Sequence, residues 1–179
     1  MFRTGTIPAA LILTLTPAGL SAQAPAPDLS DPEVAHVAVT ANAIDIELGR
    51  LAQSRARAEP VRQFAQTMVT DHSAVNQQAA ALAARLGVTP QDNAVSRSLL
   101  EGAAEARKAI EQAAGDGFDR AYVAREVAYH QAVLDALDAV LIPTSSNAEL
   151  KKLLSDVRPA VAAHLEHARQ LQSTLASAK

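Results

Sequence analysis

The chain has 179 residues, enough for one domain with a sizeable core, and nearly half of them are hydrophobic while only 3% are aromatic. Its 16 Lys and Arg nearly balance its 19 Asp and Glu, and no basic stripe is interleaved with aromatics, so nucleic acid is not an expected partner. The chain has no cysteine, which excludes disulfides, thiol catalysis and zinc–thiolate sites. An alanine-rich, aromatic-poor composition favours packed helices over sheets and predicts an all-α protein.

The N-terminal residues 1–24 have the pattern of a signal peptide. Arg3 supplies a positive charge, Ile7–Leu20 form an apolar stretch, and small residues follow, with cleavage expected near Ala22. The apolar stretch has about 14 residues, short of the roughly 20 that a spanning helix needs, so no stable membrane span is expected after cleavage.

Two segments follow the expected signal peptide. Residues 25–31 form a Pro/Ala linker, and residues 32–176 carry the helical patterns of a folded domain. The mature domain is therefore expected to be periplasmic or secreted.

Four long helices are indicated by heptad-spaced apolar residues. They are expected over residues 32–59, 60–86, 116–141 and 148–176. Asp31 is the expected N-cap of the first helix, Pro60 separates the first two helices, and Gly87 ends the second. Asn147 is the expected N-cap of the last helix, and Pro159 predicts a kink inside it.

A shorter helix is expected between the second and third long helices. Ser98 and Glu101 have the spacing of a capping box, and the thin apolar face of residues 98–114 predicts a helix that lies over the bundle. The whole segment 87–116 is long enough to travel the roughly 40 Å length of the bundle. Two antiparallel hairpins joined by a long crossover that carries an extra short helix predict a ferritin-like four-helix bundle.

In this topology, each long helix places at least one potential metal ligand in one central layer. The candidate ligands are His72, His130 and His164, with Glu126 and Glu47 as carboxylate ligands or hydrogen-bond partners of the histidines. Burying such groups costs free energy unless they pair with one another or share a cation. Imidazole and carboxylate together suit Fe, Zn, Cu, Ni or Mn. The alternative is a hydrogen-bonded core network that binds nothing and fixes the helix register.

Other polar residues near this layer have different expected roles. Asp71 adjoins His72 and is expected to orient its ring. Asp119 is expected to cap the N-terminus of its own helix rather than to bind metal. His36 lies off the heptad positions and is expected to face solvent.

Several stretches of this chain resemble a known family. They are ELGRLA at 47–52, FAQTMVTDH at 64–72, GFDRAY at 117–122 followed by His130, and Pro159 followed by His164 and Leu165. In this order they resemble the ferritin-like bacterial exported proteins named domain of unknown function 4142. The resemblance covers about residues 32–175 and implies an exported four-helix domain, but it implies no reaction. A methionine is common in the family pattern where this chain has Glu126, so a ligand role for Glu126 would be particular to this chain.

The histidine-containing helices lack one motif of the di-iron ferritin relatives. Those relatives use Glu-x-x-His pairs, whereas here Val69, Val127 and Val161 stand three residues before the histidines. A ferroxidase is therefore not expected, and no nucleophile–base pair or phosphate loop indicates another enzyme. The layer of histidines and carboxylates indicates a periplasmic bundle that binds or buffers a metal ion. The alternative is a metal-free structural or protein-interaction module of the cell envelope, related to stress, with an envelope protein or a second copy as partner.

Overall fold

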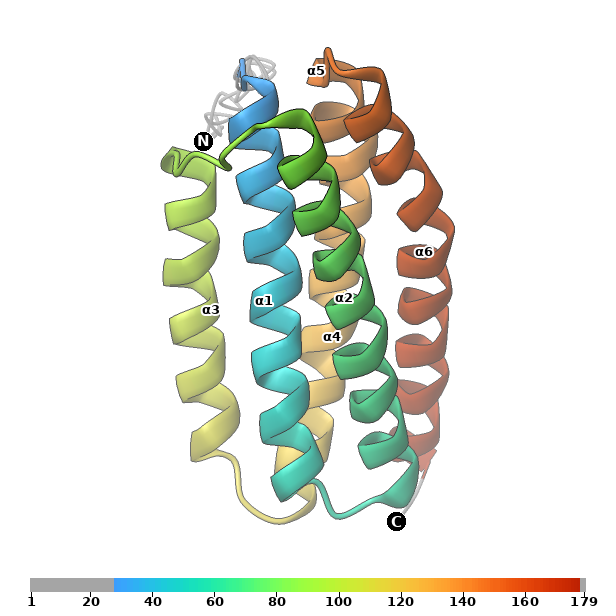
Figure 1. The fold of residues 1–179 in the computed structure, drawn as a ribbon. Coiled ribbons are helices and arrows are strands. Elements are labelled where there is room, and N and C mark those ends of the chain that lie inside the picture. The colour runs from blue at the N-terminus through green and yellow to red at the C-terminus, as the bar shows by residue number, and fades with distance from the viewer. Residues whose placement is uncertain (1–27, 178–179) are drawn as a thin grey trace, which may run out of the picture.

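The computed structural model describes residues 28–177, and the chain is all-helical over that range (Figure 1). Its long helices are α1 (Asp31–Arg55), α2 (Glu59–Leu86), α3 (Ala94–Gln112), α4 (Asp116–Ala136) and α6 (Ala148–Ser177). A π-helical turn, η1 (Leu137–Leu141), and the short α5 (Ile142–Thr144) connect α4 to α6. The expected signal peptide over 1–24 and the first part of the linker 25–31 lie outside the described residues. Among the helices described, none is long and apolar enough to cross a membrane.

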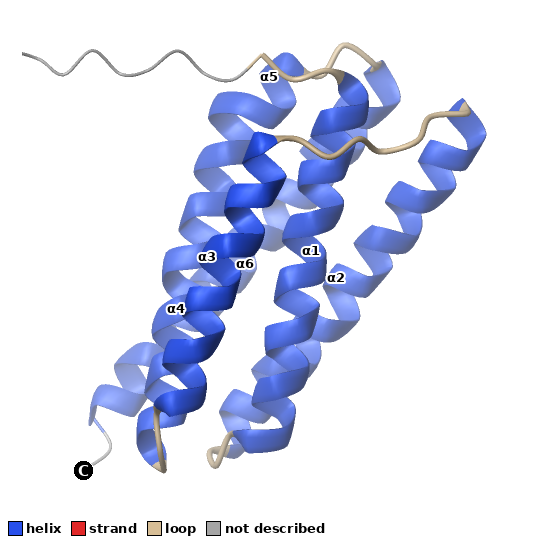
Figure 2. Cartoon of the chain, turned by 90° about the vertical axis from the view of Figure 1, so that its left-hand side faces the viewer, coloured by secondary structure: helices blue, strands red, loops and turns tan. Residues whose placement is uncertain are grey.

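The long helices are arranged as two antiparallel hairpins, one made by α1 and α2 and the other by α4 and α6 (Figures 1 and 2). Helix α3 packs against α1 and α4 at the edge of the molecule, as its thin apolar face predicts. The turn between α1 and α2, the start of α4 and the end of α6 all lie at the same end of the molecule. The middles of α1, α2, α4 and α6 therefore fall at one level.

The start of α1 differs from the expected one by a residue. Ser30 is the N-cap, and its backbone N–H donates to Glu33 Oε2 at 2.9 Å. Asp31 is not the cap of its own helix; its carboxylate accepts from the backbone N–H of Ser146 at 2.8 Å and of Asn147 at 2.9 Å. Asp31 thus joins the start of α1 to the start of α6. Leu29 is buried as well, so the packed domain begins before the expected boundary at residue 32.

Helix α3 begins earlier than its sequence predicts. Its N-cap is Asn93, whose side-chain oxygen accepts from the backbone N–H of Ser96 at 3.0 Å. The expected capping box at Ser98 and Glu101 is wrong, and α3 is a 19-residue helix rather than a short one. Asn93 is buried and also donates to the Glu33 carbonyl oxygen of α1 at 3.2 Å, so a contact between helices selects this start.

Asp119 caps a helix other than its own. Its buried carboxylate accepts from the backbone N–H of Arg57 at 3.0 Å and of Ala58 at 2.7 Å, at the start of α2. The prediction that it caps α4 is therefore wrong; its carboxylate instead holds the turn that precedes α2. This contact ties the second hairpin to the turn of the first.

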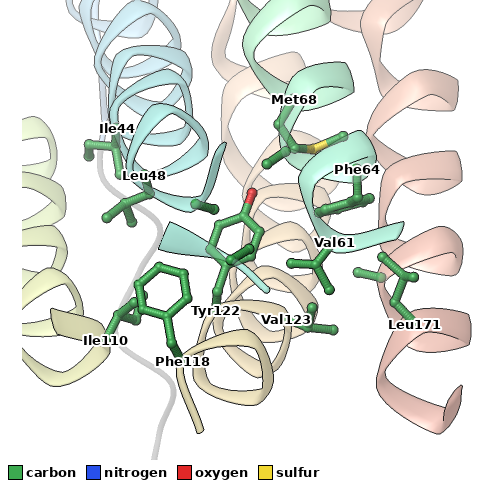
Figure 3. Close-up of a cluster of buried hydrophobic side chains, with 14 residues drawn as sticks. Ile44, Leu48, Val61, Phe64, Met68, Ile110, Phe118, Tyr122, Val123 and Leu171 are labelled. Carbon is green, nitrogen blue, oxygen red and sulfur yellow. The ribbon is translucent and has the colours of Figure 1, made fainter. Parts of the chain in front are cut away.

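Two clusters of buried apolar side chains fill the bundle on either side of its middle. The cluster near the α1–α2 turn is built around Phe64, Phe118 and Tyr122 (Figure 3). The cluster near the opposite end includes Leu134 and Leu154. Along the four helices of the two hairpins, the buried polar residues described below lie between these clusters.

The packing of α1 on α2 depends on Gly49. A Cβ atom at this position would lie 2.9 Å from Val69 Cγ2 and 3.1 Å from the Ala65 carbonyl oxygen. We expect Gly49→Ala to lower the free energy of unfolding by about 1–3 kcal/mol in urea denaturation, because neighbouring atoms must move. The control is Gly102→Ala in the exposed face of α3, where a Cβ meets nothing within 4 Å. That change should stabilise by roughly 0.5–1 kcal/mol through helix propensity; equal effects at both sites would contradict the close packing.

Candidate metal centre

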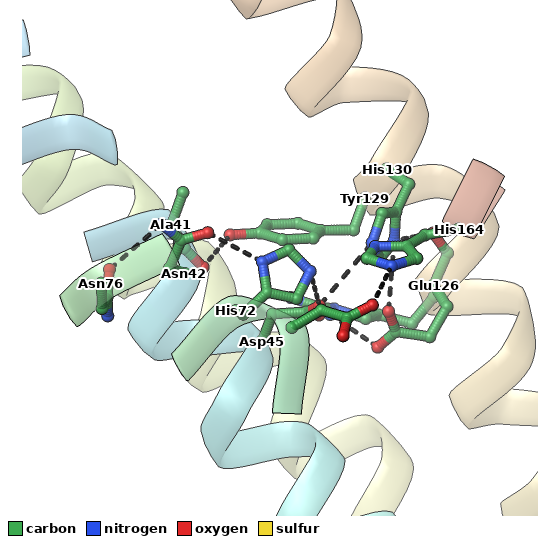
Figure 4. Close-up of polar contacts among 11 residues, drawn as sticks. Ala41, Asn42, Asp45, His72, Asn76, Glu126, Tyr129, His130 and His164 are labelled. Carbon is green, nitrogen blue, oxygen red and sulfur yellow. Dashed lines mark hydrogen bonds and ion pairs between the residues drawn. The ribbon is translucent and has the colours of Figure 1, made fainter. Parts of the chain in front are cut away.

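Three buried histidines from three helices meet in the middle of the bundle (Figure 4). His72 comes from α2, His130 from α4 and His164 from α6, and their ring centroids lie 5.3–5.7 Å apart. One potential ligand atom from each ring lies within 4.8 Å of the others. These three residues, which the sequence placed in one layer, form what we call the histidine cluster.

His72 is oriented by an amide on the neighbouring helix. Its Nδ1 lies 2.7 Å from Asn42 Oδ1 of α1. The Asn42 amide nitrogen donates to Asn76 Oδ1 at 3.0 Å, which fixes the oxygen of Asn42 toward the histidine. Because that oxygen can only accept, His72 Nδ1 carries a proton and donates it.

The other two histidines are held in the same manner. His130 Nδ1 lies 3.0 Å from the backbone carbonyl oxygen of Glu126, one helical turn earlier. His164 Nε2 lies 2.9 Å from Asp71 Oδ2 of α2. Both oxygens accept, so these ring nitrogens also donate. Asp71 was expected to orient His72, and the structure pairs it with His164 instead, because successive residues of a helix point in different directions.

The second nitrogen of each ring makes no aligned hydrogen bond, although His72 Nε2 lies 2.9 Å from Asp45 Oδ2. His72 Nε2, His130 Nε2 and His164 Nδ1 are all buried without such a bond. Since the opposite nitrogen of each ring holds a proton, these three nitrogens present lone pairs in the neutral form of the rings. Three convergent imidazole lone pairs with fixed outer partners are the arrangement that metal-binding histidines have.

Two carboxylates lie beside the histidine cluster. Asp45 of α1 is fully buried, and its Oδ2 lies 2.9 Å from His72 Nε2 and 3.7 Å from His130 Nε2. Glu126 of α4 is also fully buried, with Oε2 at 3.3 Å from His130 Nδ1. Neither Asp45 Oδ2 nor Glu126 Oε2 has an aligned hydrogen-bond donor. The opposite oxygen of each carboxylate lies 2.7 Å from Arg125 Nη1.

The pKa values of the two carboxylates are shifted in opposite directions, because their charged neighbours differ in effect while burial tends to raise both. Burial tends to raise the pKa of Asp45, but contact with His72 and the charges of Arg125 and His130 hold it well below its usual range. For Glu126, burial and the charge of Asp45 raise the pKa. Asp45 is therefore the carboxylate that stays ionised most readily.

The pKa values of His130 and His164 are also shifted in opposite directions. Burial alone would lower the pKa of His130, but its contacts with Glu126 and the charge of Asp45 outweigh burial and raise it. Burial lowers the pKa of His164, and Asp71 only partly opposes this effect. His164 is thus the ring of these two that folding keeps neutral.

Glu47, the fifth candidate ligand, is not part of the centre. Its side chain is exposed and forms an ion pair with Arg107 of α3. Asp45 takes the place in the layer that the sequence assigned to Glu47. Residues two apart on a helix face nearly opposite directions, so only one of the two can point inward. A signal for Asp45 does exist in the sequence, because Gly49 and Ala52 continue its row with small buried residues.

An apolar cleft leads from the histidine cluster along the bundle. It has a volume of about 420 Å³ and is lined mainly by Ala, Val and Leu side chains of α1, α2 and α6, with His72, His164 and Asp71 in its wall. From the level of the histidines it extends toward Leu86 at the end of α2, where α2 stands apart from the other helices (Figure 2). Ala80 also lines the cleft and is exposed, so the cleft reaches the surface.

The fold and the centre together define an all-helical protein with a buried group of histidines and carboxylates. The chain belongs to the family described as Domain of unknown function (DUF4142), whose family model matches residues 16–171. This match confirms the predicted membership of the domain of unknown function 4142 family.

Two solved structures are similar to this one. The "Crystal structure of DUF305 fragment from Deinococcus radiodurans" has a TM-score of 0.66 at 15% identity, over 84% of this chain and 99% of that one. The structure described as "CopM in the Cu(II)-bound form" has a TM-score of 0.62 at 12% identity, over 82% of this chain and 98% of that one. Identities this low establish a shared fold only. Comparison with curated proteins finds no match.

The pKa shifts of the histidines can be measured in the metal-free protein by NMR titration of the imidazole signals. We expect His130 to titrate above the ordinary value of about 6.5 and His164 to titrate below it. Asp71→Asn should lower the pKa of His164 further, since the Asp71 carboxylate raises it. A His164 that titrates above His130 would contradict this assignment of burial and charge.

The same shifts set how stability depends on pH. Folding lowers the pKa of His164, so its contribution to stability is present above pH of about 6.5 and is lost as pH falls through its folded-state value. Folding raises the pKa of His130, so its contribution is present below that pH and is lost as pH rises through its own folded-state value. Substituting His164 with Gln should therefore remove part of the acid sensitivity of unfolding.

Proposed function

We propose that this protein is an exported ferritin-like helical bundle that binds a transition-metal ion through His72, His130 and His164. The observation that carries the proposal is the set of three buried imidazoles whose potential ligand atoms lie within 4.8 Å of one another, with an inner nitrogen on each ring that makes no aligned hydrogen bond. The ferritin-like assignment is supported by two antiparallel hairpins joined by a long connection, which here contains α3. Export is supported by the signal-peptide pattern of residues 1–24.

The centre has a surplus of acceptors, which a cation would relieve. His72 Nε2 faces Asp45 Oδ2 at 2.9 Å, and both are acceptors when the imidazole is neutral. An unsatisfied buried acceptor costs about 1–3 kcal/mol, so several together substantially lower the free energy of unfolding of a small domain. One metal ion accepts lone pairs from the whole histidine cluster at once, and Asp45 can contribute a carboxylate oxygen to it.

The outer partners of the histidines support the same conclusion. Asn42, Asp71 and the Glu126 carbonyl oxygen each fix one ring in the tautomer whose bare nitrogen faces the centre. Metal-binding histidines commonly donate their second N–H to a carboxylate, carbonyl or amide oxygen, which holds the ligand in place before the ion arrives. The cleft beside His72 and His164 offers an ion a route from the surface.

Copper is the first metal to test among Fe, Zn, Cu, Ni and Mn. Imidazole nitrogens suit copper, and Cu(II) binds such sites most tightly among the divalent first-row ions. The similar structure described as "CopM in the Cu(II)-bound form" is consistent with this choice. We propose metal binding or metal buffering rather than iron oxidation, because the Glu-x-x-His pairs of the di-iron proteins are missing.

Elemental analysis of the mature protein, exported in its host and purified without chelators or a His tag, tests this proposal. We expect about one metal ion per chain, lost in His72→Ala and in His164→Ala because each removes a ligand. Glu47→Gln and His36→Ala are matched controls outside the centre and should retain the metal. Absence of metal after soaking with each of the five candidate ions would refute metal binding and favour a hydrogen-bonded core network.

The outer partners give a separate prediction. Asn42→Ala leaves all three histidines in place but frees the His72 ring, so we expect metal affinity to fall by about 10–100-fold. Competition with a chelator of known affinity measures this change. The control is Gln53→Ala, which removes a surface hydrogen bond from the same helix. Equal losses in both variants would mean that α1 as a whole, and not the orientation of His72, sets the affinity.

A further inference from the structure

A second set of ligand atoms adjoins the histidine cluster. Asp45, Glu126 and His130 each offer one buried ligand atom, and these atoms also lie within 4.8 Å of one another. We call this set the carboxylate subsite; it shares His130 with the histidine cluster. Carboxylate-rich helical bundles use such neighbouring sets to hold two metal ions. The residues of this centre could therefore supply ligands for two metal ions, one at the histidine cluster and one at the carboxylate subsite.

A cation from the chain itself already occupies the carboxylate subsite. Arg125 Nη1 lies 2.7 Å from Asp45 Oδ1 and 2.7 Å from Glu126 Oε1, which places it between the two carboxylates. The Arg125 side chain is only 10% exposed. Its guanidinium lies 3.7 Å from the centre of the Tyr129 ring.

The position of the Arg125 guanidinium is fixed by the aromatic ring on which it stacks. Tyr129 donates its hydroxyl to the Ala41 carbonyl oxygen of α1 at 2.9 Å, so the ring under the guanidinium is itself anchored. Stacking on an aromatic ring and bonding to two carboxylates are contacts that suit the planar guanidinium and not the ammonium of lysine. The side chain is also charged at every physiological pH. Arg125 is thus a permanent, positioned cation.

We propose that Arg125 takes the place of a second metal ion and thereby restricts the centre to one ion held mainly by histidines. This inference rests on the proposed function. The guanidinium holds one oxygen of each carboxylate and repels a second cation from the remaining oxygens. The ligand set left to the metal is rich in imidazole, which favours copper, zinc or nickel over manganese. Arg125 is therefore a residue that determines both the number and the kind of ions bound.

The test compares the mature wild-type protein with Arg125→Gln, which removes the charge, by equilibrium dialysis with Mn(II) and with Cu(II) and elemental analysis. We expect one ion per chain in the wild type and two in Arg125→Gln. The increase in bound ions should be larger for Mn(II), because the carboxylate oxygens of Asp45 and Glu126 then lack their arginine partner. EPR of the Mn(II) form should show the coupling of two neighbouring ions. Arg125→Gln combined with Glu126→Gln should return the count to one. Arg107→Gln, which removes an arginine paired with the exposed Glu47, is the matched control and should stay at one.

Each outcome bears on the inference separately from the proposed function. One ion in both the wild type and a folded Arg125→Gln, or two ions in the wild type, would overturn the role of Arg125 while leaving metal binding intact. No ion in the wild type but one in Arg125→Gln would support the role of Arg125 and refute binding at the histidine cluster. No ion in either protein would refute both.

Folding of the variant supplies a second readout. Removal of Arg125 leaves two buried carboxylates without their cation, so metal-free Arg125→Gln should melt at a lower temperature than the wild type. Addition of Mn(II) should restore the melting temperature, since the ion replaces the lost charge. A variant that remains unfolded or equally destabilised at saturating Mn(II) would show that a metal ion does not substitute for the guanidinium.

Discussion

The buried carboxylate of Asp45 is the point at which three helices of the two hairpins meet. It lies on α1, contacts His72 of α2, and contacts Arg125 and His130 of α4. A charge in this position is tolerable only because positive and hydrogen-bonding groups surround it. The surrounding groups must in turn be held at fixed distances, so the helices cannot slide past one another. The two apolar clusters pack on either side of this polar layer.

Two further carboxylates fix the ends of the bundle. Asp31 joins the start of α1 to the start of α6, and Asp119 joins α4 to the turn between α1 and α2. These contacts satisfy backbone N–H groups that the helix starts leave free. They also place the central levels of the helices opposite one another, which brings the three histidines together. The architecture of the caps and the geometry of the centre are therefore parts of one arrangement.

The histidines were found from the sequence because each occupies a heptad position that apolar residues otherwise fill. Asp45 and Arg125 were missed for physical reasons. Asp45 lies beside the main heptad row of α1, in a row that becomes buried only because α1 contacts both α2 and α4. In the sequence, Arg125 has the pattern of a surface charge. Its buried position depends on stacking against Tyr129, whose hydroxyl is held by the Ala41 carbonyl oxygen of another helix.

The sequence by itself determined the all-helical class, most helix ends and the layer of three histidines, because heptad spacing, proline and glycine act over a few neighbouring positions. Its short matching stretches determined the family. Only the tertiary structure decided which carboxylate faces the centre, which helix each cap serves and which nitrogen of each histidine is bare. Those outcomes depend on contacts such as Asn42 with His72 and Asp71 with His164, which join different helices. The spacing of apolar residues shows which face of a helix is buried, because a helix has about 3.6 residues per turn. The direction of a single ring or carboxylate depends instead on its partner on the neighbouring helix.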